Sequence, residues 1–165
     1  MSVGKRLLLI LSVVVCCAGC DRVSKSYAEA QLPGTPALSF LAGSLRLQLS
    51  HNEGAFLSLG ASLPKPWREA IFRGGVACVL AGLLAYAVFF ARASPWSVAG
   101  ASLVFAGGAS NLADRFLYDG NVVDFINIGI GSFRTGIFNV ADMAITAGIV
   151  LLLFGARRAG EPAGK

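Results

Sequence analysis

The chain has 165 residues, of which 55% are hydrophobic and only 14% are charged. Soluble domains carry roughly 25% charged residues, and the mean hydropathy here is +0.68, so the composition excludes most classes of soluble protein. The net charge of +5 is modest, and the basic residues form no stripe interleaved with aromatic residues, which argues against a nucleic-acid partner. We therefore expect one integral membrane domain over residues 1–165, with the lipid bilayer as its surroundings.

Four apolar segments are predicted to cross the membrane as helices. The first continues past Asp21 to Tyr27, because about 20 helical residues are needed to span a bilayer. The four segments are residues 7–27, 71–90, 96–112 and 137–155.

Basic residues flank these segments unevenly. They precede the first segment, follow the fourth and lie in the short link between the second and third, at Lys5, Arg6, Arg92, Arg157, Arg158 and Lys165. The positive-inside rule then predicts that both termini and this link are cytoplasmic. Residues 28–68 and 115–136 are left on the extracytoplasmic side, where we expect any chemistry to take place.

The two extracytoplasmic segments show different patterns. Residues 45–49 alternate between apolar and polar side chains, which predicts a short strand in a small sheet lying on the outer leaflet. Residues 118–133 combine an Asp119-Gly120-Asn121 turn with an apolar run, which we interpret as a loop or interfacial helix packed on the bundle. The expected fold class is therefore an all-α membrane protein with four transmembrane helices, a small extracytoplasmic β-sheet and an interfacial loop or helix.

The N-terminus resembles a bacterial lipoprotein signal, with basic residues, an apolar run and then Cys17-Ala18-Gly19-Cys20. Three further apolar segments follow, however, so a retained first helix with small residues for close packing is favoured. The cysteines all fall in apolar segments and imply no disulfide framework or zinc spacing, at Cys16, Cys17, Cys20 and Cys78.

A charged residue inside a membrane-spanning segment costs free energy, so we treat each one as a candidate for a functional site. Asp21 and Lys25 share a helix face at i and i+4; the alternative is an ion pair that lets the helix end sit in the interface. Asn111, Asp114 and Arg115 end the third segment. Their alternative is a structural clamp, in which Asp114 balances Arg115 and Asn111 bonds to another helix.

Two carboxyls are predicted to lie at the same outer level of the membrane. Asp124 is surrounded by large apolar residues, so desolvation is expected to raise its pKa. Asn139 and Asp142 are at i and i+3 as the fourth segment begins. Two such carboxyls could share a proton, with one acting as base on a water and the other as acid, and they would titrate as a unit.

We expect neither a metal nor a cofactor. His51 is the only histidine, which excludes a histidine-rich metal site. Asn and Asp oxygens could hold Mg²⁺ or Ca²⁺, but the outer cluster offers few carboxylates for a hydrated cation.

Five patches, in this order, resemble those of the bacterial lipoprotein signal peptidase family, the signal peptidase II aspartic proteases. They are Asp21-Arg22-Val23-Ser24-Lys25, Asn52-Glu53-Gly54-Ala55-Phe56, the stretch from Gly107 to Arg115, Val122-Val123-Asp124-Phe125, and Phe138-Asn139-Val140-Ala141-Asp142. The chain departs from the pattern at Phe56, which many members precede with a second alanine, and at Ser110, where many have glycine. Both departures lie outside the two carboxyls.

The resemblance implies that Asp124 and Asp142 are a catalytic dyad, which activates a water and cleaves prolipoproteins just before a diacylglyceryl-modified cysteine. It also implies the bacterial inner membrane, an active site at the outer leaflet, and inhibition by the cyclic peptide globomycin; we further expect a monomer. Phe56 either lines the cleft or anchors in the interface, and Arg115 either holds the substrate backbone or neutralises Asp114. The expected supporting residues are Asp21, Lys25, Asn52, Gly54, Phe56, Asn111, Asp114, Arg115 and Asn139.

Two other classes of function compete with the protease. A small channel or proton-coupled transporter would also need acids in the membrane, but its charges should thread through the membrane depth. A lipoprotein or scaffold without chemistry would carry a lipid on Cys20.

Overall fold

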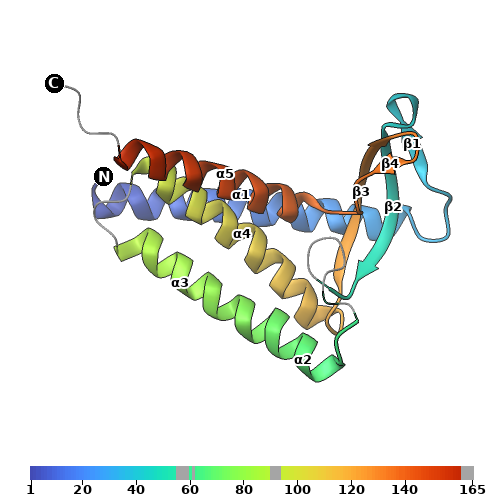
Figure 1. Cartoon of the computed structure of the whole chain (residues 1–165), viewed down its shortest axis with the longest axis horizontal. Coiled ribbons are helices and arrows are strands. Elements are labelled where there is room, and N and C mark those ends of the chain that lie inside the picture. Colours follow the sequence, from blue (N-terminus) through green and yellow to red (C-terminus); the bar gives the residue numbers. More distant parts are fainter. Residues whose placement is uncertain (55–59, 61, 90–93, 161–165) are drawn as a thin grey trace.

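A computed structural model describes residues 1–54, 60, 62–89 and 94–160. Long helices run side by side, and a small sheet stands across one end of them (Figure 1). The helices are α1 (Val3–Gln31), α2 (Lys65–Glu69), α3 (Val76–Phe89), α4 (Pro95–Leu117) and α5 (Val140–Gly160). A π-helical turn at Ala70–Gly75 joins α2 to α3, so the two form one rod.

The described part of each predicted apolar segment lies on a helix, apart from the first three residues of the fourth segment. By length and composition, α1 and the rod Lys65–Phe89 are apolar enough to cross a membrane, and α5 contains a shorter apolar stretch, Val140–Gly155. The helix α4 is richer in glycine and serine, which lowers its hydropathy. Among the flanking basic residues, Arg92 and Lys165 lie outside the described residues.

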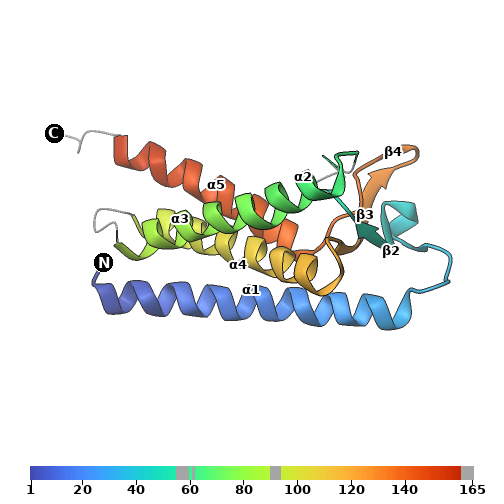
Figure 2. The ribbon, with the colours of Figure 1, turned by 90° about the horizontal axis from the view of Figure 1, so that it is seen from below.

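The helix α4 is central, because it packs against α1, α3 and α5 (Figure 2). Its glycines allow α5 to approach closely. A Cβ atom built on Gly148 of α5 would lie 2.7 Å from the carbonyl oxygen of Gly100, and one built on Gly107 would overlap the carbonyl oxygen of Ala141. Helices in lipid gain little from the hydrophobic effect, so their association depends on the close van der Waals packing that such small residues allow.

The sheet has four antiparallel strands in the order β1-β2-β3-β4. The strand predicted at 45–49 is confirmed as part of β2, and Leu47 pairs with Ile126 across to β3. A register shift between Leu47 and Ser50 brings Ser50 opposite Asp124. The strands are β1 (Leu38–Phe40), β2 (Leu45–Asn52), β3 (Val122–Ile130) and β4 (Phe133–Arg134).

The prediction of a loop or interfacial helix over residues 118–133 is wrong, because most of this segment forms β3 and the start of β4. Five of the nine β3 residues are valine or isoleucine, and these β-branched side chains favour an extended backbone. Pairing with β2 then supplies the partners for its backbone groups. The predicted turn is present, with positive φ angles of 49° at Asp119 and 97° at Gly120.

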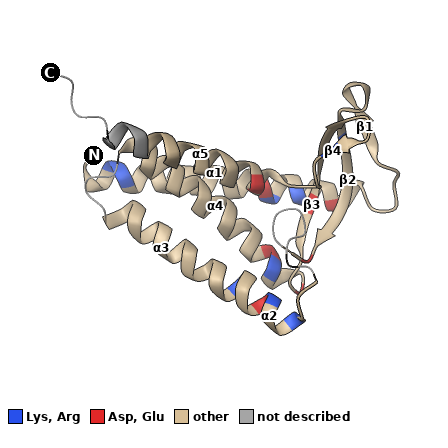
Figure 3. Cartoon of the chain, viewed as in Figure 1, with Lys and Arg blue, Asp and Glu red and all other residues tan. Residues whose placement is uncertain are grey.

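Charged residues gather towards the two ends of the helices, and most lie near the sheet (Figure 3). The middle of α1 instead exposes large apolar side chains such as Leu8, Leu11 and Val15, each more than 60% exposed. An apolar exterior between two polar ends is the distribution expected for a protein surrounded by lipid.

We predict that Gly148→Ala lowers the thermal unfolding temperature in detergent. The new methyl group would meet the backbone at Gly100 and Val104, and such overpacking costs about 1–3 kcal/mol. The matched control is Gly82→Ala in α3, where a Cβ atom has nothing within 4 Å, so its midpoint should not fall. Equal midpoints for the two variants would contradict the close α4–α5 packing.

Candidate active site

A buried ammonium lies between two carboxylates near the sheet end of the bundle. Lys25 Nζ is 2.7 Å from Asp21 Oδ2 and 2.8 Å from Asp114 Oδ2, and the side chains are at most 1% exposed. Arg22 adds a second cation, 2.8 Å from the other Asp114 oxygen. The pairing of Asp21 with Lys25 is therefore confirmed, and it is buried between α1 and α4.

The structural alternative paired Arg115 with Asp114, but the direct ion pairs of Asp114 are with Arg22 and Lys25, and the charge of Arg115 acts on Asp142, Asp124 and Asp114 without contact. Asp114 takes its cations from α1, whereas Arg115 donates to two backbone carbonyls, those of Asn111 and Gly54, at 3.3 and 2.8 Å. Asn52 supports the same segment, because its Oδ1 accepts from the Gly54 amide at 2.9 Å. Arg115 thus fixes the backbone where β2 ends.

Asn111 links the buried charges to Asp142. Its Oδ1 accepts from Lys25 at 2.8 Å and from Asn139 at 3.1 Å, and its Nδ2 donates to Asp142 Oδ1 at 2.9 Å. An ammonium can only donate, so Lys25 determines which end of the amide faces Asp142. The structural alternative, in which Asn111 bonds across to another helix, is borne out by these contacts with α1 and α5.

Asn139 joins the two carboxyls that the sequence singles out. Its Nδ2 donates to Asp124 Oδ1 at 2.7 Å, and its backbone N–H donates to Asp142 Oδ2 at 3.2 Å. In return, the Asp142 N–H donates to Asn139 Oδ1 at 2.9 Å. These reciprocal hydrogen bonds form a capping box at the start of α5. Asn139 and Asp142, whose spacing predicted a functional site, therefore also stabilise the first turn of the helix.

Burial changes the acidity of Asp124, which lies in β3 and is 2% exposed. Desolvation raises its pKa to about 6, and the nearby charge of Asp142 adds to the increase. Hydrogen bonds from Asn52, at 3.0 Å, and from Asn139 act in the opposite direction, because they stabilise the ionised form. The increase expected from the apolar neighbours is confirmed.

Asp142 opens onto a cavity of about 430 Å³ between α3, α4 and α5. Its polar end is formed by Asn111, Arg115 and Asp142, and the rest of its wall is mostly apolar. The lining is Phe72, Val76, Gly108, Asn111, Arg115, Asp142, Ile145, Thr146 and Ile149. Such a cavity suits a substrate with a polar reacting group and an apolar remainder.

The structure brings together almost all of the predicted site residues. They are Asp21, Lys25, Asn52, Gly54, Asn111, Asp114, Arg115, Asp124, Asn139 and Asp142. Phe56 lies outside the described residues, as do its neighbours Ala55, Leu57 and Leu59. No group of three or more His, Cys, Asp or Glu side chains that could hold a metal ion occurs in the described part of the chain.

Four further residues belong to the network but were not predicted as part of it. Arg22 donates to the hydroxyl of Tyr118 at 2.8 Å, and that hydroxyl donates to Glu29 at 3.0 Å. Ser110 donates to Asp21 Oδ2 at 2.6 Å. Arg22 and Ser110 lie within the five sequence patches that resemble the family, and this position could have identified them as members of the site. Nothing comparable marks Tyr118 and Glu29.

Two solved structures share this fold, and each is described as the structure of a bacterial membrane enzyme. The first has a TM-score of 0.77 at 24% identity, and the match covers 98% of this chain and 94% of the other. The second has a TM-score of 0.74 at 25% identity, with coverage of 93% and 92%. The fold, the apolar exterior and the buried polar site thus define the class of the chain as a helical membrane protein.

The family follows from the sequence comparisons. The family model described as signal peptidase (SPase) II matches residues 13–157. A lipoprotein signal peptidase of Streptococcus pneumoniae is 30% identical over 149 residues, or 90% of this chain and 92% of the relative. One from Bifidobacterium longum is 35% identical over 158 residues, or 90% and 80%. The chain belongs to the signal peptidase II family and is a peptidase, which confirms the resemblance and excludes a scaffold without chemistry.

We predict that Lys25→Met strongly destabilises the protein. The change leaves Asp21 without its buried cation and removes one of the two cations of Asp114, and breaking a buried pair costs about 3–5 kcal/mol. Lys65→Met is the matched control, because Lys65 pairs with Asp119 at the surface, where ion pairs contribute little. Unfolding temperatures in detergent would test this, and an unchanged midpoint for Lys25→Met would contradict it.

Proposed function

We propose that Asp124 and Asp142 are the catalytic pair of this peptidase, and that its substrates are diacylglyceryl-modified prolipoproteins, cut just before the modified cysteine. The main support is that Asn139 holds one carboxyl from β3 and one from α5 in a single hydrogen-bonded cluster, at 2.7 and 3.2 Å. The names of the matched relatives, lipoprotein signal peptidases, support the substrate class.

In this proposal the pair holds one proton between its two members. The ionised carboxylate takes a proton from a water, whose oxygen attacks the carbonyl carbon of the scissile bond. The other carboxyl gives its proton to the amide nitrogen as the carbon–nitrogen bond breaks, leaving a carboxylic acid and an amine. A pKa of about 6 for Asp124 supports this division, because this carboxyl can then hold a proton at a pH where an exposed aspartate is ionised.

The proposed setting is the bacterial inner membrane, with one domain over residues 1–165 crossing it four times. Both termini would be cytoplasmic, and the sheet and catalytic pair would lie at the outer leaflet. The gathering of charged residues near the sheet (Figure 3) supports this placement. Asp114, Asp124 and Asp142 also belong to one hydrogen-bonded network through Lys25, Asn111 and Asn139, which supports one depth for the three acids. The competing transporter needs acids that thread the membrane.

The remaining roles belong to the same proposal. Asn52, Asn111 and Asn139 orient the two carboxyls, and Arg115 holds the Gly54 backbone beside them. The apolar walls of the 430 Å³ cavity would receive the apolar part of the substrate from the membrane. Globomycin would compete for this cavity, and the active protein would be a monomer.

We predict that Asp124→Asn and Asp142→Asn each abolish cleavage of a purified diacylglyceryl-modified prolipoprotein, because each carboxyl has its own proton role. The assay is performed in detergent with a metal chelator present, on protein whose folding is verified by its unfolding transition. Asp119→Asn is the control, since this carboxylate is exposed and pairs only at the surface. Substantial turnover by either folded dyad variant would reject the assignment.

The pH profile should respond to Asn52. Its amide donates to Asp124 at 3.0 Å and lowers the pKa of that carboxyl, so Asn52→Ala should raise the pKa above its value of about 6. The limb of the kcat/KM profile that reports Asp124 should therefore move to higher pH. Gln48→Ala removes an amide from the same strand and should leave that limb in place. A limb that does not move in Asn52→Ala would contradict the role of Asp124.

A further inference from the structure

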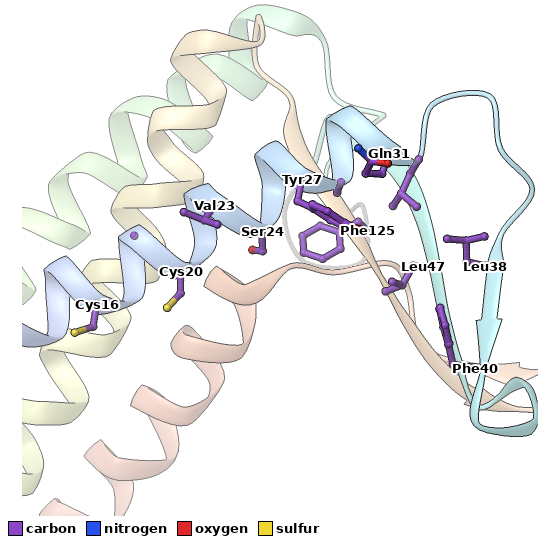
Figure 4. A pocket seen from close by; sticks show the side chains of 13 residues that line it. Cys16, Cys20, Val23, Ser24, Tyr27, Gln31, Leu38, Phe40, Leu47 and Phe125 are labelled. Atoms are coloured by element: carbon purple, nitrogen blue, oxygen red, sulfur yellow. The ribbon is translucent and has the colours of Figure 1, made fainter.

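A second cavity, larger than the one at Asp142, runs along α1 beneath the sheet (Figure 4). Its volume is about 870 Å³, at the upper end of the range for ligand pockets of roughly 300–1,000 Å³. We call it the α1 groove. It is lined by Cys16, Gly19, Cys20, Val23, Ser24, Tyr27, Ala28, Gln31, Leu32, Leu38, Phe40, Leu47 and Phe125.

The α1 groove and the cations of α1 use opposite faces of the same helix, and Asp21 lies at the edge of the groove face. At about 100° per residue, the groove-lining positions of α1 centre on the side opposite Arg22 and Lys25. The sheet separates them in the same way. Asp124 bonds to Asn139 on one side of β3, whereas the next residue, Phe125, lines the groove, as successive strand residues point to opposite faces.

The α1 groove has the dimensions and chemistry of a lipid tail site. From Cys16 to Gln31 the helix rises about 22 Å, which exceeds the roughly 15 Å of hydrocarbon in one leaflet of a 30 Å core. No Lys, Arg, Asp or Glu is among its lining residues. The Ser24 hydroxyl is satisfied within α1, because it donates to the Asp21 carbonyl at 2.9 Å.

The α1 groove is also continuous with the lipid-facing surface. Val23 and Tyr27 line it and are 71% and 67% exposed, and the exposed apolar face of α1 continues from them towards Val15. A lipid in the bilayer can therefore enter from the side. The polar side chains of the lining are only Ser24, Tyr27 and Gln31, so water in this space would have few groups to bind.

We propose that the α1 groove holds one acyl chain of a bilayer phospholipid. The chain packs between α1 and the apolar underside of the sheet, against Leu38, Phe40 and Leu47, and so supports the sheet that carries Asp124. The substrate's own lipid is a different ligand, because β3 and the fully buried Asn139 separate the groove from the catalytic pair. The inference depends on the membrane setting and not on the catalytic assignment.

The test is photo-crosslinking of the full chain in nanodiscs with a phosphatidylethanolamine that carries a diazirine near the end of one acyl chain. Mass spectrometry of peptides then locates the adducts. We expect them to concentrate on groove residues of α1, β1 and β2. Adducts spread evenly over all lipid-facing helices would overturn the proposal.

A groove-filling variant makes the test specific. A Cβ atom on Gly19 has nothing within 4 Å, so Gly19→Trp can place its ring in the groove without moving the backbone. Groove adducts should fall about tenfold, the loss expected when a displaced chain gives up about two buried methylene groups. Gly82→Trp, at an equally open glycine of α3 outside the groove, should leave them unchanged. Unchanged adducts in Gly19→Trp would also overturn the proposal.

A competition experiment separates the bilayer lipid from the substrate. Groove adducts should persist when excess diacylglyceryl-modified prolipoprotein is added to the Asp124→Asn variant, and displacement by this substrate would reject a bilayer lipid as the occupant. The readout requires no turnover, so failure of the catalytic proposal leaves this test intact.

Discussion

The structure depends on one lysine ammonium that is kept in a dry interior. A charge in such surroundings persists only when it is paired and hydrogen-bonded, and Lys25 is paired with Asp21 and Asp114. The same carboxylates also accept the backbone N–H groups of Ala141 and Val123, at 2.8 and 3.2 Å. The Ala141 amide lies at the start of α5, and the Val123 amide lies next to the proposed catalytic residue of β3, Asp124. One buried charge therefore fixes α1, α4, α5 and β3 relative to one another.

The low polarity of the interior, which raises the free-energy cost of burying this ammonium, also favours the proposed chemistry. Desolvation keeps a carboxyl protonated closer to neutrality than it would be in water, as the pKa of about 6 for Asp124 shows. Asparagines surround the two carboxyls and orient them without adding charge. In this arrangement the sheet closes one end of the site, and the proposed substrate would enter the apolar cavity between α3, α4 and α5.

Local patterns in the sequence predict some of these features, and long-range pairing decides the others. Hydropathy locates the helices, and the spacing of Asp21 and Lys25 identifies their ion pair, because both depend on neighbours along one helix. The apolar run of β3 fits a helix or a strand, and its pairing with β2, about 75 residues earlier in the chain, decides the outcome. The cations of Asp114 likewise come from α1, so the adjacent Arg115 was a misleading partner.

The central claim is that Asp124 and Asp142 act as one electrostatically coupled unit, held together by Asn139. An isotope-edited infrared titration of the Asp124 carboxyl, in the wild type and in Asp142→Asn, tests it most directly. Because the charge of Asp142 raises the pKa of Asp124, the wild-type carboxyl should titrate near pH 6 and the variant at lower pH. An Asp124 carboxyl with the same pKa in both proteins would contradict the account.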